Sequence, residues 1–145
     1  MRALVAGLAL VALAACGGGS SSVQASTSVA GSWNLETYNG KSLPATGTAN
    51  DNGSVDRVDG GSIAFDTLGN YVLAIKIVNT LGATVSQQDY NEIGSYSGTA
   101  ATGVTLKPFD LSSGKGPYKG STVPVTISGK TLSFSQEGKP LLFER

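Results

Sequence analysis

The sequence predicts an all-β fold of about eight short strands, which could form a meander barrel or a sandwich; an eight-stranded antiparallel meander barrel is the architecture we expect. Three observations support this prediction. Apolar and polar residues alternate with a period of two in short segments along most of the chain. Turn-forming residues, including many of the 20 glycines, separate these segments. Beyond the N-terminal apolar run, no segment shows the periodicity of an amphipathic helix.

Length and composition indicate a single domain with no net charge. The chain has 145 residues, 14% of them charged, and a formal net charge of zero, which does not favour nucleic acid as a partner. Histidine, the commonest general base and metal ligand, is absent from the sequence. Asp51, Asp56 and Asp59 do not have the spacing of a calcium-binding loop. We therefore expect no metal, no other cofactor and no enzymatic activity.

Residues 1–15 have the features of a signal peptide that is removed. Arg2 supplies a positive charge, and the apolar run from Ala3 to Leu13 is too short to span a bilayer. The tetrapeptide Leu13-Ala14-Ala15-Cys16 resembles the bacterial lipobox. This resemblance implies that Cys16 carries acyl chains such as palmitate and becomes the first residue of the mature protein. The alternative is an ordinary secretory signal with an incidental cysteine.

Residues 16–30 combine the lipidated cysteine with a flexible Gly/Ser tether, and residues 31–145 are expected to form the barrel. In Gram-negative lipoproteins an Asp after the cysteine is usual for retention in the inner membrane, and Gly17 stands there in this chain. The resemblance therefore implies a lipid-anchored protein of the bacterial cell envelope, at the outer membrane. Its membrane contact would be made through the N-terminal lipid.

The strands follow one another from Gly31 onward. Trp33, Leu35 and Thr37 share one face of the first strand, and Asn39-Gly40 forms the tight turn that ends it. The polar residues from Ala45 to Gly61 predict a loop. The strands are expected over Ser32–Tyr38, Ser62–Asp66, Tyr71–Val78, Ala83–Asp89, Ile93–Ser97, Gly103–Lys107, Thr122–Ser128, Thr131–Phe134 and Leu141–Arg145.

The alternation also predicts which side chains point into the barrel. An eight-stranded barrel is just wide enough either to be filled by side chains or to hold one small ligand, and the sequence leaves both possibilities open. The expected inward-facing residues are Trp33, Leu35, Ile63, Phe65, Tyr71, Leu73, Ile75, Ile77, Val123, Val125, Ile127, Leu132, Phe134, Leu141 and Phe143.

The domain resembles the small bacterial lipocalin-like lipoproteins. Gly31-Ser32-Trp33 matches the Gly-x-Trp signature of the first lipocalin strand, and Asn39-Gly40 with Leu43-Pro44 continues the pattern. Further short matches are Gly94-Ser95-Tyr96, the Ser128–Leu132 hairpin and the Phe143-Glu144-Arg145 ending. The chain departs from true lipocalins because no helix follows the last strand. The Gly-x-Trp and Asn-Gly opening also occurs in META-type envelope domains, whose different β-rich fold is the alternative.

The resemblance implies a protein that binds or carries a small apolar or amphipathic molecule in the envelope. An interaction or inhibitor module that contacts another, unidentified envelope protein through its loops is the alternative, and a hydrolase using carboxylates is a third. Under the first hypothesis, the residues expected to line the ligand site are Leu35, Phe65, Tyr71, Leu73, Ile75 and Phe134.

The resemblance also implies how one end of the barrel is closed. In lipocalins an arginine on the last strand packs across the ring of the Gly-x-Trp motif. Arg145 is the match, because it continues the alternation of Leu141 and Phe143. We therefore expect Arg145 to lie over Trp33, and a ligand entrance at the opposite end, near loops such as Asp66 to Asn70.

Overall fold

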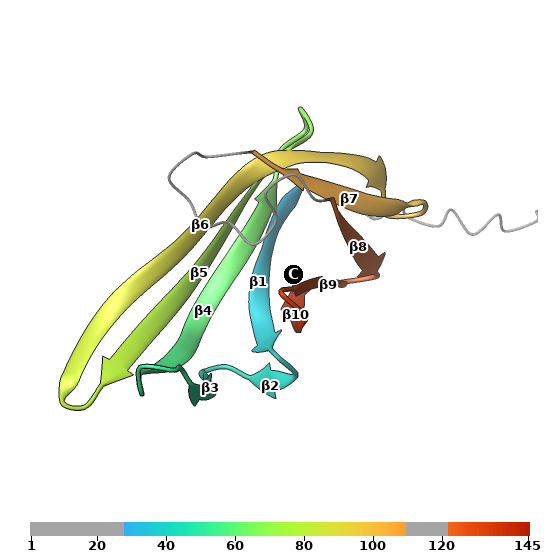
Figure 1. Ribbon diagram of the computed structural model, residues 1–145. Helices are drawn as coiled ribbons and strands as arrows, with labels where there is room; N and C mark the ends of the chain where they lie inside the picture. Colours follow the sequence, from blue (N-terminus) through green and yellow to red (C-terminus); the bar gives the residue numbers. More distant parts are fainter. Residues whose placement is uncertain (1–27, 110–121) are drawn as a thin grey trace, which may run out of the picture.

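The computed structural model describes residues 28–109 and 122–145 of the chain (Figure 1). Eight strands pair antiparallel, each with the next, and β1 closes the ring by pairing with both β10 and β4. This confirms the predicted eight-stranded meander barrel. The barrel strands are β1 (Gly31–Tyr38), β4 (Val55–Phe65), β5 (Asn70–Leu81), β6 (Thr84–Thr99), β7 (Gly103–Pro108), β8 (Val123–Ser128), β9 (Thr131–Gln136) and β10 (Lys139–Glu144).

Two short strands lie between β1 and β4 in the chain. They are β2 (Lys41–Ser42), which pairs with the end of β1, and β3 (Ala45–Ala49), which pairs with β4. The prediction of a loop over Ala45–Gly61 is therefore wrong for most of its length. A β-bulge between Val58 and Gly60 shifts the register of β4 against β5, and such a bulge interrupts the alternation that would have revealed the strand.

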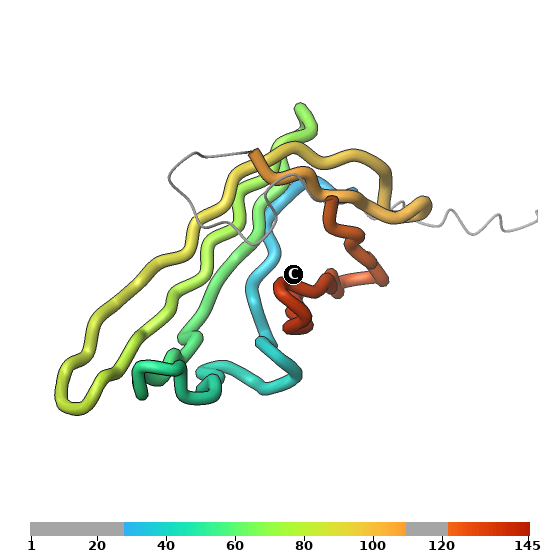
Figure 2. Tube along the Cα trace, in the orientation of Figure 1, coloured from blue at the N-terminus to red at the C-terminus, as the bar shows by residue number. Residues whose placement is uncertain are grey.

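The predicted strands Ala83–Asp89 and Ile93–Ser97 are also wrong as separate elements. They form one strand, β6, which pairs with β5 without interruption from Thr84 to Ser95. The polar sequence of its first half is explained by its position. The long strands β4, β5 and β6 extend past the other barrel strands as a ribbon (Figure 2). Near the tip of this ribbon, β6 is exposed on both of its faces from Thr84 to Asp89. Merging the two segments brings the barrel to eight strands.

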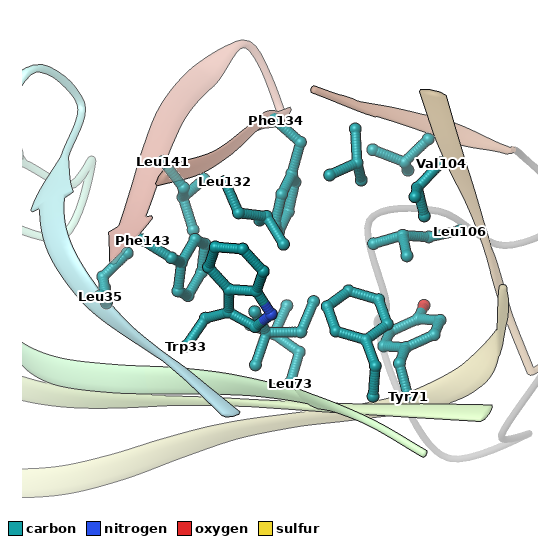
Figure 3. Packing of buried hydrophobic residues seen from close by; sticks show 14 of the residues in the cluster. Trp33, Leu35, Tyr71, Leu73, Val104, Leu106, Leu132, Phe134, Leu141 and Phe143 are labelled. Carbon is teal, nitrogen blue, oxygen red and sulfur yellow. The ribbon is translucent and has the colours of Figure 1, made fainter. Parts of the chain in front are cut away.

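The barrel interior is filled by one apolar cluster that gathers around Trp33 (Figure 3). Of the fifteen side chains expected to point inward, all belong to this cluster or pack against it, with Ile77 and Ile127 only partly buried. The cluster also contains Val29, Val58, Val104 and Leu106, which the alternation had not singled out. A packed core of this kind supplies the main driving force for folding.

Because neighbouring strands are antiparallel, successive turns lie at opposite ends of the barrel. We call the end where β1 begins and β10 finishes the Trp33 end, because Asn34 pairs with Glu144 there. The opposite end, where β1 meets β2 and where β10 begins at Lys139, is called the Lys139 end.

Candidate binding site

The Trp33 end is closed by Trp33 and Arg145. The Trp33 side chain is fully buried, and the guanidinium carbon of Arg145 lies 4.0 Å from the centroid of its ring. This is the contact that the resemblance implied. A guanidinium over an indole face is attracted by the ring quadrupole, and the arginine stem covers apolar surface.

The chain that precedes β1 is held across the same end. Arg145 donates hydrogen bonds from Nη1 to the carbonyl of Ala30 at 3.3 Å and from Nη2 to the carbonyl of Ser28 at 2.7 Å. The indole Nε1 of Trp33 donates to the carbonyl of Val29 at 3.3 Å. The two side chains of the closing pair therefore also fix the entry of the chain into the barrel.

The Asp66–Asn70 turn is not near an entrance, and this expectation is wrong. Gly31 pairs with Phe65, so the turn after β4 lies at the Trp33 end, beside the start of β1. The reason is the antiparallel direction of β4 relative to β1. The Asp66 carboxylate accepts hydrogen bonds from the side chain and backbone of Asn70 and from the backbone of Leu68, and these bonds hold the pKa of Asp66 below its ordinary value.

The six residues expected to line a ligand site are packed against one another and their neighbours. All of them are buried members of the apolar cluster. Phe65 lies with its ring centroid 6.3 Å from that of Tyr71, and Phe134 stacks on Phe143 at 5.5 Å. Phe134 also borders a shallow outer groove between Pro124 and Pro140. The six residues are therefore part of the packed core.

A cavity of about 250 Å³ lies at the Lys139 end. Its apolar surface comes from Tyr38, Val58 and Ile77, on β1, β4 and β5. The remaining lining residues come from the β1–β2 turn, from β2, β3 and β4, from the turn after β3, from the β9–β10 turn and from the start of β10. They are Asn39, Lys41, Thr46, Gly47, Thr48, Asn50, Asp56, Glu137 and Lys139. None of the six expected lining residues borders this cavity.

Two lysines place positive charge at this cavity. Lys41 donates a hydrogen bond from Nζ to the carbonyl of Thr46 at 3.0 Å, and Nζ of Lys139 lies 5.8 Å from the centroid of the Tyr38 ring. Within residues 28–109 and 122–145 the one ion pair joins Arg57 to Asp59, so neither ammonium group is paired with a carboxylate. The cavity therefore combines an apolar floor with a border that carries two lysines and two carboxylates, Asp56 and Glu137.

The acidic residue Asp56, which also borders the cavity, is engaged by amides. Its carboxylate accepts hydrogen bonds from Asn50 at 3.1 Å and from Asn79 at 2.7 Å. These bonds tie the turn after β3 to β4 and β5. In the described part of the chain, no group of three or more histidine, cysteine or acidic residues could hold a metal ion.

Glu92 is a buried carboxylate inside the barrel that was not predicted from the sequence. Glu92 on β6 is only 7% exposed and accepts hydrogen bonds from the hydroxyl of Tyr71 to Oε1 and from that of Tyr90 to Oε2, each at 2.6 Å. The alternation of Tyr90, Glu92 and Gly94 is the signal that places Glu92 on the inner face. With both carboxylate oxygens accepting, the group ties β5 to β6 inside the core.

A scan against models of protein families matches no family, and a search of curated proteins finds no match. The predicted signal peptide, Cys16 and most of the predicted tether lie outside the described residues. Over the described ranges, the chain contains no helix with the length and apolar character needed to cross a membrane.

Proposed function

We propose that this chain is a lipid-anchored lipoprotein of the bacterial outer membrane that binds a small amphipathic molecule without acting on it chemically. The observation that supports the proposal best is the contrast between the two ends of the barrel. One end is closed by Trp33 and Arg145, and the other contains a cavity. Ligand sites in small barrels are found at their mouths.

The lining of the cavity favours a particular ligand chemistry. An apolar body would contact Val58 and Ile77, while a polar or zwitterionic head group would lie at the border. Both the lysines Lys41 and Lys139 and the carboxylates Asp56 and Glu137 line this border. Cavities that hold drug-sized ligands measure roughly 300–1,000 Å³. The cavity here has about 250 Å³, so we infer a ligand at the small end of that range, or one whose head group extends into solvent.

Filling the cavity is expected to abolish ligand binding. Ile77 borders the cavity, whereas its neighbour Val78 points to the other face of β5. In Ile77→Trp the indole would occupy the space of the ligand, while Val78→Trp adds the same ring outside. Native mass spectrometry of the Cys16→Ser chain purified from cells should show a small-molecule adduct, which Val78→Trp retains and Ile77→Trp loses.

A bare mass throughout, with no uptake of apolar fluorophores by the purified chain, would contradict the carrier proposal. It would favour the alternative, a module that contacts another envelope protein through its loops. An adduct that survives in Ile77→Trp would place the ligand elsewhere in the protein.

Replacing Cys16 by serine is expected to release the protein from the membrane. The physical reason is that acyl chains on Cys16 are the only membrane attachment that the proposal invokes, and serine cannot form the thioether. Fractionation of cells that express each form should move most of the Cys16→Ser protein to the soluble envelope or secreted fraction. A Cys16→Ser protein that stays in the membrane pellet after a salt wash would overturn the lipoprotein proposal.

A further inference from the structure

One long edge of the sheet has no partner strand. The strand β6 has 16 residues, but β7 pairs only with its last part, from Gly94 to Thr99. Within the described residues, no strand pairs with the outer side of Thr84–Glu92, which we call the β6 edge. In Figure 1 this edge is the yellow outer border of the ribbon that β4, β5 and β6 form.

The backbone groups that face outward along the β6 edge can be identified. The carbonyl of Ile93 points outward, because it accepts a hydrogen bond from the backbone of Phe109 at 3.0 Å. The pairing of β6 with β5 runs without a bulge, so inward and outward directions alternate along the strand. The N–H and C=O groups of Val85, Gln87, Asp89 and Asn91 therefore face outward as well.

The β6 edge lacks the features by which proteins prevent edge-to-edge association. Such features are proline, lysine, bulges, shortness or an inward-pointing charge on an exposed edge. From Thr84 to Asn91 the edge contains no proline, no lysine and no bulge, and its one charged side chain is Asp89. The inward-pointing charge of Glu92 lies at the end of the edge, next to the start of β7 pairing, and is hydrogen-bonded within the barrel. An edge of this length that remains open favours a strand as its partner.

We propose that the β6 edge pairs with the same edge of a second copy of this chain, antiparallel, about a two-fold axis at Gln88. This register places Val85 opposite Asn91 of the second copy and Gln87 opposite Asp89 of the second copy. All four outward-facing residues of each copy are then hydrogen-bonded. A register shifted to centre on Asp89 would set the two Asp89 carboxylates opposite each other and would require the Ile93 carbonyl, which is already bonded.

The side chains are complementary in the same register. Gln87 already donates to the Asp89 carboxylate of its own chain at 3.0 Å, so the two share a face, and the pairing offers each carboxylate a second amide. Val85 is 65% exposed and Ile93 is 39% exposed on this face. The two-fold pairing brings Val85 of one copy diagonally beside Ile93 of the other and removes both from water. The inference is independent of ligand binding.

Disulfide cross-linking tests the register. In the full chain with Cys16→Ser, Gln88→Cys introduces the only thiol, and across the two-fold axis the two Cα atoms would be roughly 4.5 Å apart, within reach of a disulfide. Mild oxidation should convert Gln88→Cys almost completely to a covalent dimer. Thr84→Cys is the matched control on the same exposed strand: its two copies would lie about 27 Å apart and should stay unlinked.

A proline variant tests the backbone pairing by a second route. Gln87→Pro removes an N–H that faces outward and leaves the hydrogen bonds to β5 in place, so the fold should keep its thermal midpoint under monomeric conditions. Sedimentation should show a dimer for the parent chain and a dimer dissociation constant for Gln87→Pro raised on the order of 100-fold. Three outcomes would each overturn the proposal: a monomeric parent chain, equal cross-linking at positions 84 and 88, or an unchanged dissociation constant. A monomeric parent would point to an extended segment of another protein as the partner.

Discussion

Replacing Trp33 by alanine is expected to lower the free energy of unfolding by about 3–5 kcal/mol, the range for truncating a fully buried aromatic side chain. Trp33 is completely excluded from solvent and lies at the centre of the cluster in Figure 3, so its removal would leave a large cavity. The variant also loses the hydrogen bond to the carbonyl of Val29 and the ring beneath Arg145. Urea denaturation monitored by far-ultraviolet circular dichroism measures the change.

The matched variant Arg145→Ala separates the two halves of the closing pair. It leaves the core intact and removes the cation–π contact together with two hydrogen bonds to exposed backbone, so we expect a loss of about 0.5–2 kcal/mol. The fluorescence of Trp33 should shift as its uncovered ring meets water. If Arg145→Ala changes neither the thermal midpoint nor the emission while Trp33→Ala is strongly destabilising, the guanidinium contributes nothing to closing this end.

The barrel could be predicted because its strands obey local rules. The alternation of Trp33 with Leu35, and of Tyr71 with Leu73 and Ile75, follows directly from burial on one face of a pleated strand. The same rule fails where the backbone departs from it. The bulge at Val58–Gly60 conceals the first half of β4. The polar, exposed residues of the first half of β6 conceal that the strands expected over Ala83–Asp89 and Ile93–Ser97 are one strand.

The candidate site could not be predicted because no local pattern marks it. The cavity joins side chains from distant parts of the chain, among them Lys41, Ile77 and Lys139, and only the closed barrel brings them together. The large inward-facing residues Phe65 and Phe134 were expected to contact a ligand. Instead, Phe65 packs against the rings of Tyr71 and Tyr96, and Phe134 stacks on Phe143. Which turns share an end depends on strand direction, which places the Asp66 turn beside the closing pair.

Replacing Gly94 by alanine is expected to destabilise the barrel by about 2–3 kcal/mol, because the new methyl group has no space. A Cβ at Gly94 would lie 2.5 Å from Cε1 of the Tyr71 ring and 2.5 Å from the backbone carbonyl oxygen of Lys107. Neither neighbour moves easily. Tyr71 is buried and anchored through its hydroxyl to Glu92, and Lys107 belongs to β7, which pairs with β6 at this point.

The control for Gly94→Ala is a second strand glycine with open space around it. A Cβ at Gly60 would meet no atom within 4 Å, so Gly60→Ala should change the free energy of unfolding by less than about 1 kcal/mol and can stabilise the fold by restricting the unfolded chain.

Combining Gly94→Ala with Tyr71→Ala relieves the contact with the ring but not that with Lys107, and it also costs the buried Tyr71 side chain and its bond to Glu92. The double variant should therefore lose less than the sum of the two single losses. Strict additivity in urea denaturation would show that the Tyr71 ring does not press on Gly94, and the clash with the β7 backbone would then have to account for the whole effect.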